Sequence, residues 1–333
     1  MSVTPDARLL LGTAALFALS GCVPPPPPAP GMLEGDAGPP APTWVDLGPG
    51  GDACERTPLT VAPQTPQIIL MLDRSGSMGA SRWEPARQAV VDLTESMDAS
   101  WEVGLELFPS AASDDECGVL GLDVFPVAPH AETIAAVLSD ATPHGATPTT
   151  AALEFAGAAF AALRARESAM SMPRPQTIVL VTDGASNCDP YGNLNDSIIA
   201  TTETVRQLRS EGITTYVIGY DIGGQSVAAR AMDDWASEGG TGVALHVRDG
   251  ETLLAELRNA VASTAPCAFA IDAMPSDPAL LRIRLDGRVL RRDTDYAWMP
   301  GMGIQLSAER CLAVRDGESH PLAAELLCVP DFG

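Results

Sequence analysis

Aspartate and hydroxyl side chains stand where three apolar stretches of the sequence begin or end. Asp73, Ser75 and Ser77 alternate directly at the end of the apolar run "QIILML". Thr147 precedes a long apolar segment, and Asp183 follows the run "TIVLVT". Carboxylates and hydroxyls are hard oxygen donors, the ligands preferred by Mg²⁺ and similar divalent cations. The residue types therefore predict a divalent-cation site, provided that the fold brings the three stretches together.

A cation held mainly by neutral hydroxyl groups still attracts one more negatively charged oxygen. An Asp or Glu carboxylate of a partner protein or peptide can supply that oxygen. Hydrolysis would need a positioned base, and the four histidines are scattered along the chain. The sequence therefore favours a binding protein over an enzyme. Two alternatives stay open: a structural scaffold in which the metal only stabilises loops, and a metal-assisted hydrolase.

Strands and helices are expected to alternate around these residues. The runs that read as buried strands are "QIILML", "EVGLELF", "TIVLVT", "TTYVIGY" and "GVALHV". Segments with helical periodicity separate them; one begins near Ser81 and places Ala86, Val90 and Leu93 on one face. This alternation predicts an α/β fold, a doubly wound and mainly parallel sheet with helices on both faces. Sites in such sheets gather at the carboxyl ends of strands, which is where Asp73 and Asp183 stand.

The three motifs together resemble a von Willebrand factor A domain with its metal-ion-dependent adhesion site. The motifs are D-x-S-x-S, the threonine loop "HGATPTT" and the strand-end "TDG", and the resemblance covers residues 66–265. It implies six strands in the order 3-2-1-4-5-6, parallel except for a short third strand. It also implies that Mg²⁺, or Mn²⁺ or Ca²⁺, is held by Asp73, Ser75, Ser77, Thr147 and Asp183. Asp183 usually acts through water in this family, and the open position takes a partner carboxylate.

The first 60 residues predict export and anchoring. Arg8 precedes "LLLGTAALFAL", which is too short to span a bilayer but suits a secretory signal. The following "LSGC" resembles a bacterial lipoprotein signal, which implies a signal peptide at 1–21 and a lipid on Cys22 that anchors the chain to the membrane. The residue after Cys22 is Val23 and not an aspartate, which by analogy with envelope sorting in two-membrane bacteria favours the outer membrane. Residues 22–60 are rich in proline and glycine and predict a tether.

Six further cysteines in an exported chain indicate disulfides, although sequence alone leaves their pairing open. The family resemblance implies three pairs. Cys54–Cys267 would close the base of the α/β domain, Cys117–Cys188 would brace loops beside the metal, and Cys311–Cys328 would remain for the C-terminal region.

Composition and patterning complete the expected organisation. A net charge of −23 argues against the basic face that nucleic-acid binding requires, so no nucleic-acid partner is expected, and no motif indicates an organic cofactor. Residues 61–266 are expected to form the α/β domain. Residues 267–333 are expected to form a small, disulfide-supported β-rich region, because "LLRIRLDGRVL" alternates in polarity and then turns at Asp286-Gly287.

Overall fold

The structure is a computed structural model that describes ten segments of the chain: 43–45, 57–110, 115–167, 174–188, 193–222, 226–264, 267–275, 277–300, 303–314 and 320–327. The expected signal peptide at 1–21, together with Cys22, Cys54 and Cys328, lies outside these segments. Within them, none of the helices has the length and apolar composition needed to cross a bilayer.

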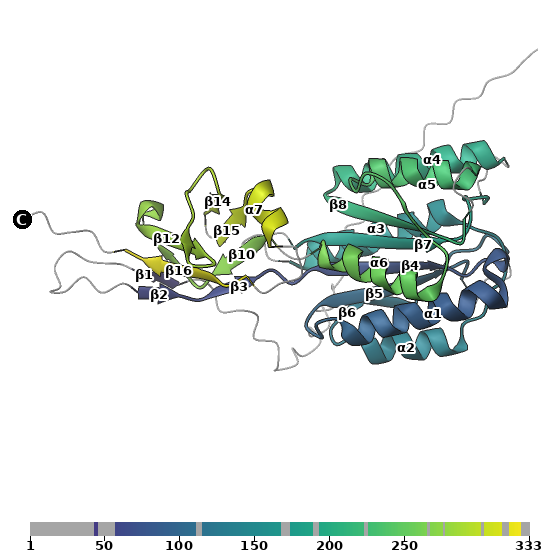
Figure 1. Ribbon diagram of the computed structural model, residues 1–333, viewed down its shortest axis with the longest axis horizontal. Helices are drawn as coiled ribbons and strands as arrows, with labels where there is room; N and C mark the ends of the chain where they lie inside the picture. The colour runs from purple at the N-terminus through teal and green to yellow at the C-terminus, as the bar shows by residue number, and fades with distance from the viewer. Residues whose placement is uncertain are drawn as a thin grey trace, which may run out of the picture. The chain divides into compact units, whose positions relative to one another are not determined.

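A six-stranded sheet forms the centre of the α/β domain (Figure 1). Its order is β6-β5-β4-β7-β8-β9, which is the predicted order 3-2-1-4-5-6. Every pair is parallel except β5 with β6, so the expected fold class is confirmed. The strands are β4 (Gln67–Asp73), β5 (Glu102–Phe108), β6 (Val124–Val127), β7 (Gln176–Thr182), β8 (Ile213–Tyr220) and β9 (Leu245–Val247).

Helices cover both faces of this sheet, and β4 shows why. All seven β4 residues are buried, because successive side chains enter opposite cores. Ile68 packs with the helices of one face, whereas Ile69 packs with those of the other. The first face carries α1 (Gly79–Ser96), α2 (Ala131–Asp140) and α6 (Gly250–Ala262). The second carries α3 (Thr149–Arg166), α4 (Leu194–Ser210) and α5 (Val227–Glu238).

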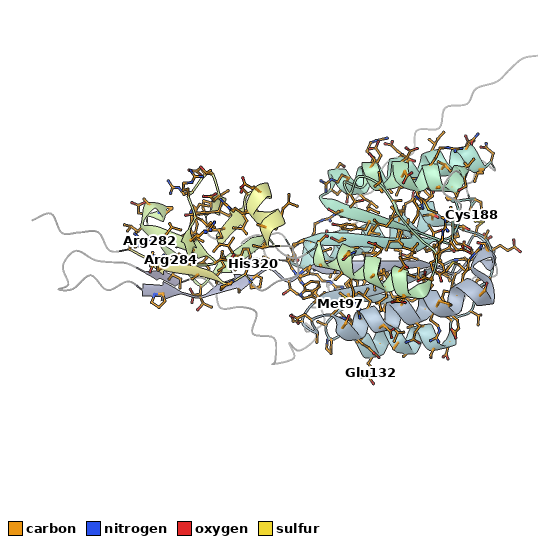
Figure 2. All side chains as sticks on the ribbon, in the orientation of Figure 1. Met97, Glu132, Cys188, Arg282, Arg284 and His320 are labelled. Carbon is orange, nitrogen blue, oxygen red and sulfur yellow. A yellow bond between two sulfur atoms is a disulfide. The ribbon has the colours of Figure 1, made fainter. Side chains whose placement is uncertain are left out.

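A separate β unit contains two four-stranded sheets, ordered β14-β15-β10-β3 and β13-β12-β16-β2. The predicted hairpin joins β12 to β13 through Asp286 and Gly287, whose φ values of 50° and 75° suit a tight hairpin turn. Arg282 and Arg284 of β12, which are labelled in Figure 2, both pair with Glu325 of β16. The later elements are β10 (Ala268–Ile271), β11 (Ala273–Pro275), β12 (Leu281–Leu285), β13 (Arg288–Val289), β14 (Tyr296–Met299), β15 (Gly303–Leu306), α7 (Ala308–Ala313) and β16 (Leu322–Leu326).

Strands that precede the α/β domain also belong to the β unit, which corrects the expected domain boundaries. β2 (Thr57–Leu59) pairs with β16, and β3 (Val61–Pro63) pairs with β10. β1 (Thr43–Val45) pairs with β11. The expected tether at 22–60 therefore contains strands, and the α/β domain begins after β3 rather than at residue 61. The α/β domain is thus an insertion between β3 and β10 of the β unit.

Two disulfides are formed within the described residues. Cys117–Cys188 has a Cα–Cα distance of 5.5 Å and is the pair that the family resemblance implied. Cys267–Cys311, at 5.3 Å, corrects both other expected pairs, Cys54–Cys267 and Cys311–Cys328. Strand pairing explains this bond: the amide of Leu306 at the end of β15 donates to the carbonyl of Cys267, and α7 carries Cys311 directly afterwards.

Candidate metal centre

The Asp73 carboxylate lies at the carboxyl end of β4 and is fully buried. Its Oδ1 accepts a hydrogen bond from the Ser75 amide at 2.7 Å, which turns the chain back over the strand end. Its Oδ2 accepts from the Thr182 hydroxyl at 2.6 Å, at the end of the neighbouring strand β7. Both bonds come from neutral donors, so the carboxylate meets no cationic side chain in either of them.

Hydroxyl groups connect Asp73 to the second predicted aspartate. The Ser75 Oγ lies 2.9 Å from the Ser77 Oγ, and the Ser77 hydroxyl donates to Asp183 Oδ1 at 2.7 Å. The Asp183 side chain is itself fully shielded from solvent. Four of the five predicted ligands therefore form one continuous hydrogen-bonded chain across the ends of β4 and β7.

The fifth predicted residue, Thr147, is joined to the others through the backbone of its loop. The Gly76 amide donates to the Gly145 carbonyl at 2.9 Å, and the His144 amide donates to the Arg74 carbonyl at 2.8 Å. Gly145 has φ +67°, and a Cβ there would lie 2.7 Å from the Glu116 carbonyl oxygen, so only glycine fits. Thr147 is almost completely buried beside this contact.

The Cys117–Cys188 disulfide joins two further loops at this edge. The Thr147 amide donates to the Asn187 side chain at 2.8 Å, and the Ala146 amide donates to the Glu116 carbonyl at 2.9 Å. Each cysteine is therefore next to a residue that bonds to the threonine loop (Cys188 is labelled in Figure 2). The loops around the centre are fixed by both covalent and backbone bonds.

Burial dominates the electrostatics of Asp73. Loss of solvent raises the pKa of its carboxyl from 3.8 to about 6, against the lowering effect of the bonds from Thr182 and Ser75, and the nearby charge of Asp183 raises it further. A bound divalent cation would compensate this charge. Among the described residues, no three His, Cys, Asp or Glu side chains cluster as a metal site. The oxygens that lie together here are the carboxylates of Asp73 and Asp183 and the hydroxyls of Ser75, Ser77 and Thr182. That donor set fits a hard cation such as Mg²⁺.

Arg82 and Asp221 complete the centre, and sequence reasoning missed both. Arg82 of α1 donates through Nη1 to Asp183 Oδ2 at 2.8 Å and to the Ser77 carbonyl at 2.9 Å. Its Nε donates to Asp221 Oδ2 at 2.8 Å. Asp221 directly follows the apolar strand β8, as Asp183 follows β7. That strand-end position was the signal that could have identified Asp221.

Comparison with known proteins bears on the α/β domain. Residues 67–260 match the family model described as the von Willebrand factor type A domain. No protein of curated function matches the chain. Among solved structures, the conserved hypothetical protein BatB from Bacteroides thetaiotaomicron is 15% identical with a TM-score of 0.45, covering 60% of this chain and 98% of that one. The vWF domain of the type V pili tip protein Mfa5 from Porphyromonas gingivalis is 13% identical with a TM-score of 0.45, covering 60% and 94%.

Proposed function

Because this chain belongs to the von Willebrand factor type A domain family, we propose that it is an adhesion-type module that binds a protein or peptide partner through a divalent cation. The cation is Mg²⁺, with Mn²⁺ and Ca²⁺ as chemically related alternatives. One observation carries the proposal. The buried Asp73, two serines and Asp183, whose side chain is shielded from solvent, are linked in a single hydrogen-bonded chain at the edge where β4 and β7 end.

Each residue has a distinct role in this proposal. Asp73 supplies a buried negative charge, while Ser75, Ser77 and Thr147 supply neutral oxygens that leave the charge of a cation only partly compensated. Asp183 is oriented from both sides, by the Ser77 hydroxyl and by Arg82. A divalent cation held by this set supplies the attraction for one carboxylate oxygen of an Asp or Glu on the partner.

The sequence supports a location for this activity at the cell envelope. We propose that residues 1–21 direct export, that a lipid on Cys22 anchors the chain to the outer membrane, and that a proline-rich segment follows the anchor. The two disulfides fit an oxidising compartment outside the cytoplasm.

Calorimetric titration of the purified protein with Mg²⁺ and Mn²⁺ tests the cation site. Asp73→Asn keeps the size of the side chain but removes its charge and replaces one of its two accepting oxygens by an NH2 group, so affinity is expected to fall on the order of 100-fold. Asp295→Asn makes the same chemical change in the β unit and serves as the matched control, with unchanged affinity. Equal binding by the wild-type protein and Asp73→Asn, with intact far-UV circular dichroism, would refute the site.

A further inference from the structure

Arg82 occupies a central position at the candidate metal centre, although it is not one of its proposed ligands. Its guanidinium contacts residues from three separate elements: Asp183 after β7, Asp221 after β8, and the Ser77 carbonyl just before α1. The Asp183 side chain is shielded from solvent, whereas about a third of the Arg82 side chain is exposed. The positive charge of the guanidinium therefore faces a buried carboxylate from the solvent side.

Both oxygens of the Asp183 carboxylate are engaged in these contacts. Oδ1 accepts from the Ser77 hydroxyl at 2.7 Å, and Oδ2 accepts from Arg82 at 2.8 Å. A guanidinium and a divalent cation are drawn to the same carboxylate and repel one another, and this repulsion is weakly screened where the charges are partly buried. Arg82 and a bound cation thus compete electrostatically for Asp183.

We propose that Arg82 is a positioning residue that acts as an internal cation of this centre, holding Asp183 in place and limiting how tightly the centre binds a divalent metal. This inference rests on the proposed cation site. It assigns Arg82 an effect on metal affinity that is opposite in sign to that of each ligand: losing a ligand weakens binding, whereas losing Arg82 strengthens it.

Asp221 supports this role by fixing the far side of the guanidinium. It accepts from Arg82 Nε at 2.8 Å and is about half exposed. Its amide donates to the Val247 carbonyl at 2.7 Å, and its backbone is left-handed, with φ 54°. Asp221 is therefore held at the end of β8 and anchors Arg82 between two strand ends.

Arg82→Gln tests the proposal by removing the charge while keeping a hydrogen-bonding side chain. Calorimetric titration with Mg²⁺ and Mn²⁺ should show affinity about tenfold higher than in the wild-type protein. Arg87→Gln is the matched control, because Arg87 lies five residues later on α1 and pairs with the exposed Glu84. Its affinity should equal that of the wild-type protein. Arg82→Lys retains the charge, so its metal affinity should also stay near that of the wild-type protein. This variant still tests the role of the charge if Arg82→Gln folds poorly.

Thermal unfolding supplies a readout that does not depend on binding heat. In chelator, Arg82→Gln should unfold at a lower temperature than wild type, because Asp183 loses its cationic partner. Saturating Mg²⁺ should narrow or reverse that difference.

The outcomes separate this inference from the proposed function. If the wild-type protein binds metal and Arg82→Gln binds it no more tightly, the role of Arg82 is refuted while the cation site stands. If Arg82→Lys gains as much metal affinity as Arg82→Gln, the proposed role of Arg82 is also refuted, because the loss of positive charge is then not the cause of the gain. If neither the wild-type protein nor Arg82→Gln binds metal, both proposals fail.

Discussion

Asp73 and Asp295 are two buried carboxylates in different parts of the molecule, and their surroundings differ sharply. Asp73, at the end of β4 in the α/β domain, accepts hydrogen bonds from the neutral donors Ser75 and Thr182, and burial raises its pKa to about 6. Asp295, just before β14 in the β unit, accepts from the amide and Nε of Arg291 and from Nε of Arg310. These bonds lower the pKa of Asp295 to about 2, and the bond from the Arg291 amide has the largest effect.

The difference separates a structural carboxylate from one suited to binding. The β unit compensates Asp295 with its own cations, so this residue needs nothing from outside the chain. In the α/β domain the guanidinium of Arg82 contacts Asp183 instead, and Asp73 keeps a desolvated charge that its own chain offsets only in part. An unmet requirement for positive charge at a strand end is the property expected of a cation ligand.

The disulfides provide the largest test of this contrast, because each part has one. Replacing Cys117 and Cys188 by serine opens a link across 71 residues, and replacing Cys267 and Cys311 opens one across 44. Each pair of substitutions should lower the free energy of unfolding by about 4 kcal/mol, as measured by urea titration. Only the replacement of Cys117 and Cys188 should also weaken Mg²⁺ binding, because the loops that carry these two cysteines contact the threonine loop. Equal effects of both on Mg²⁺ affinity would contradict the contrast.

Asp73→Asn should stabilise the protein when metal is removed. The folded pKa of about 6 exceeds the ordinary 3.8, so the folded state retains a proton that the unfolded state has lost between these values. Wild-type stability should therefore fall as pH rises from about 4 to about 6 and stay lower above that. At about pH 8 in chelator, Asp73→Asn should be more stable by about 3 kcal/mol in urea unfolding. A loss of stability there would show that the charge is already compensated.

Asp295→Asn should have the opposite and smaller effect. Its folded pKa of about 2 lies below the ordinary 3.8, so the ionised form stabilises the fold above the ordinary pKa, and this contribution is lost as pH falls toward about 2. Thermal unfolding should show the variant to be less stable than wild type near pH 7, with the gap narrowing in acid. A variant as stable as wild type at neutral pH would mean that the two arginines contribute nothing net.

The α/β domain was largely predictable from sequence because its signals are local. Buried strands such as Gln67–Asp73 show as largely apolar runs, and the proposed ligands Asp73 and Asp183 stand at the ends of such runs. Asp221 carried the same strand-end signal, but Arg82 becomes part of the centre only when α1 passes across two strand ends, which no spacing reveals.

The β unit was predicted less well because its pairings are distant in sequence. Thr57–Leu59 is short and contains Pro58, so it resembled a tether, and its partner β16 comes more than 260 residues later. The wrong disulfides share this cause. Cys267 was assigned to the base of the α/β domain, whereas β10 carries it into the β unit beside α7.

The insertion of the α/β domain between β3 and β10 has a mechanical consequence. The two strands are hydrogen-bonded neighbours, so the chain enters and leaves the domain along adjacent paths. Under the proposed function, pulling a partner held at the strand ends of the α/β domain would pass tension into β3 and β10 together instead of into one linker. The chain that leaves the domain is also cross-linked covalently, because Cys267, directly before β10, is bonded to Cys311. Under the proposed function, a domain inserted in this way would divide its load between two strands, and the residue directly before one of them is held by a disulfide.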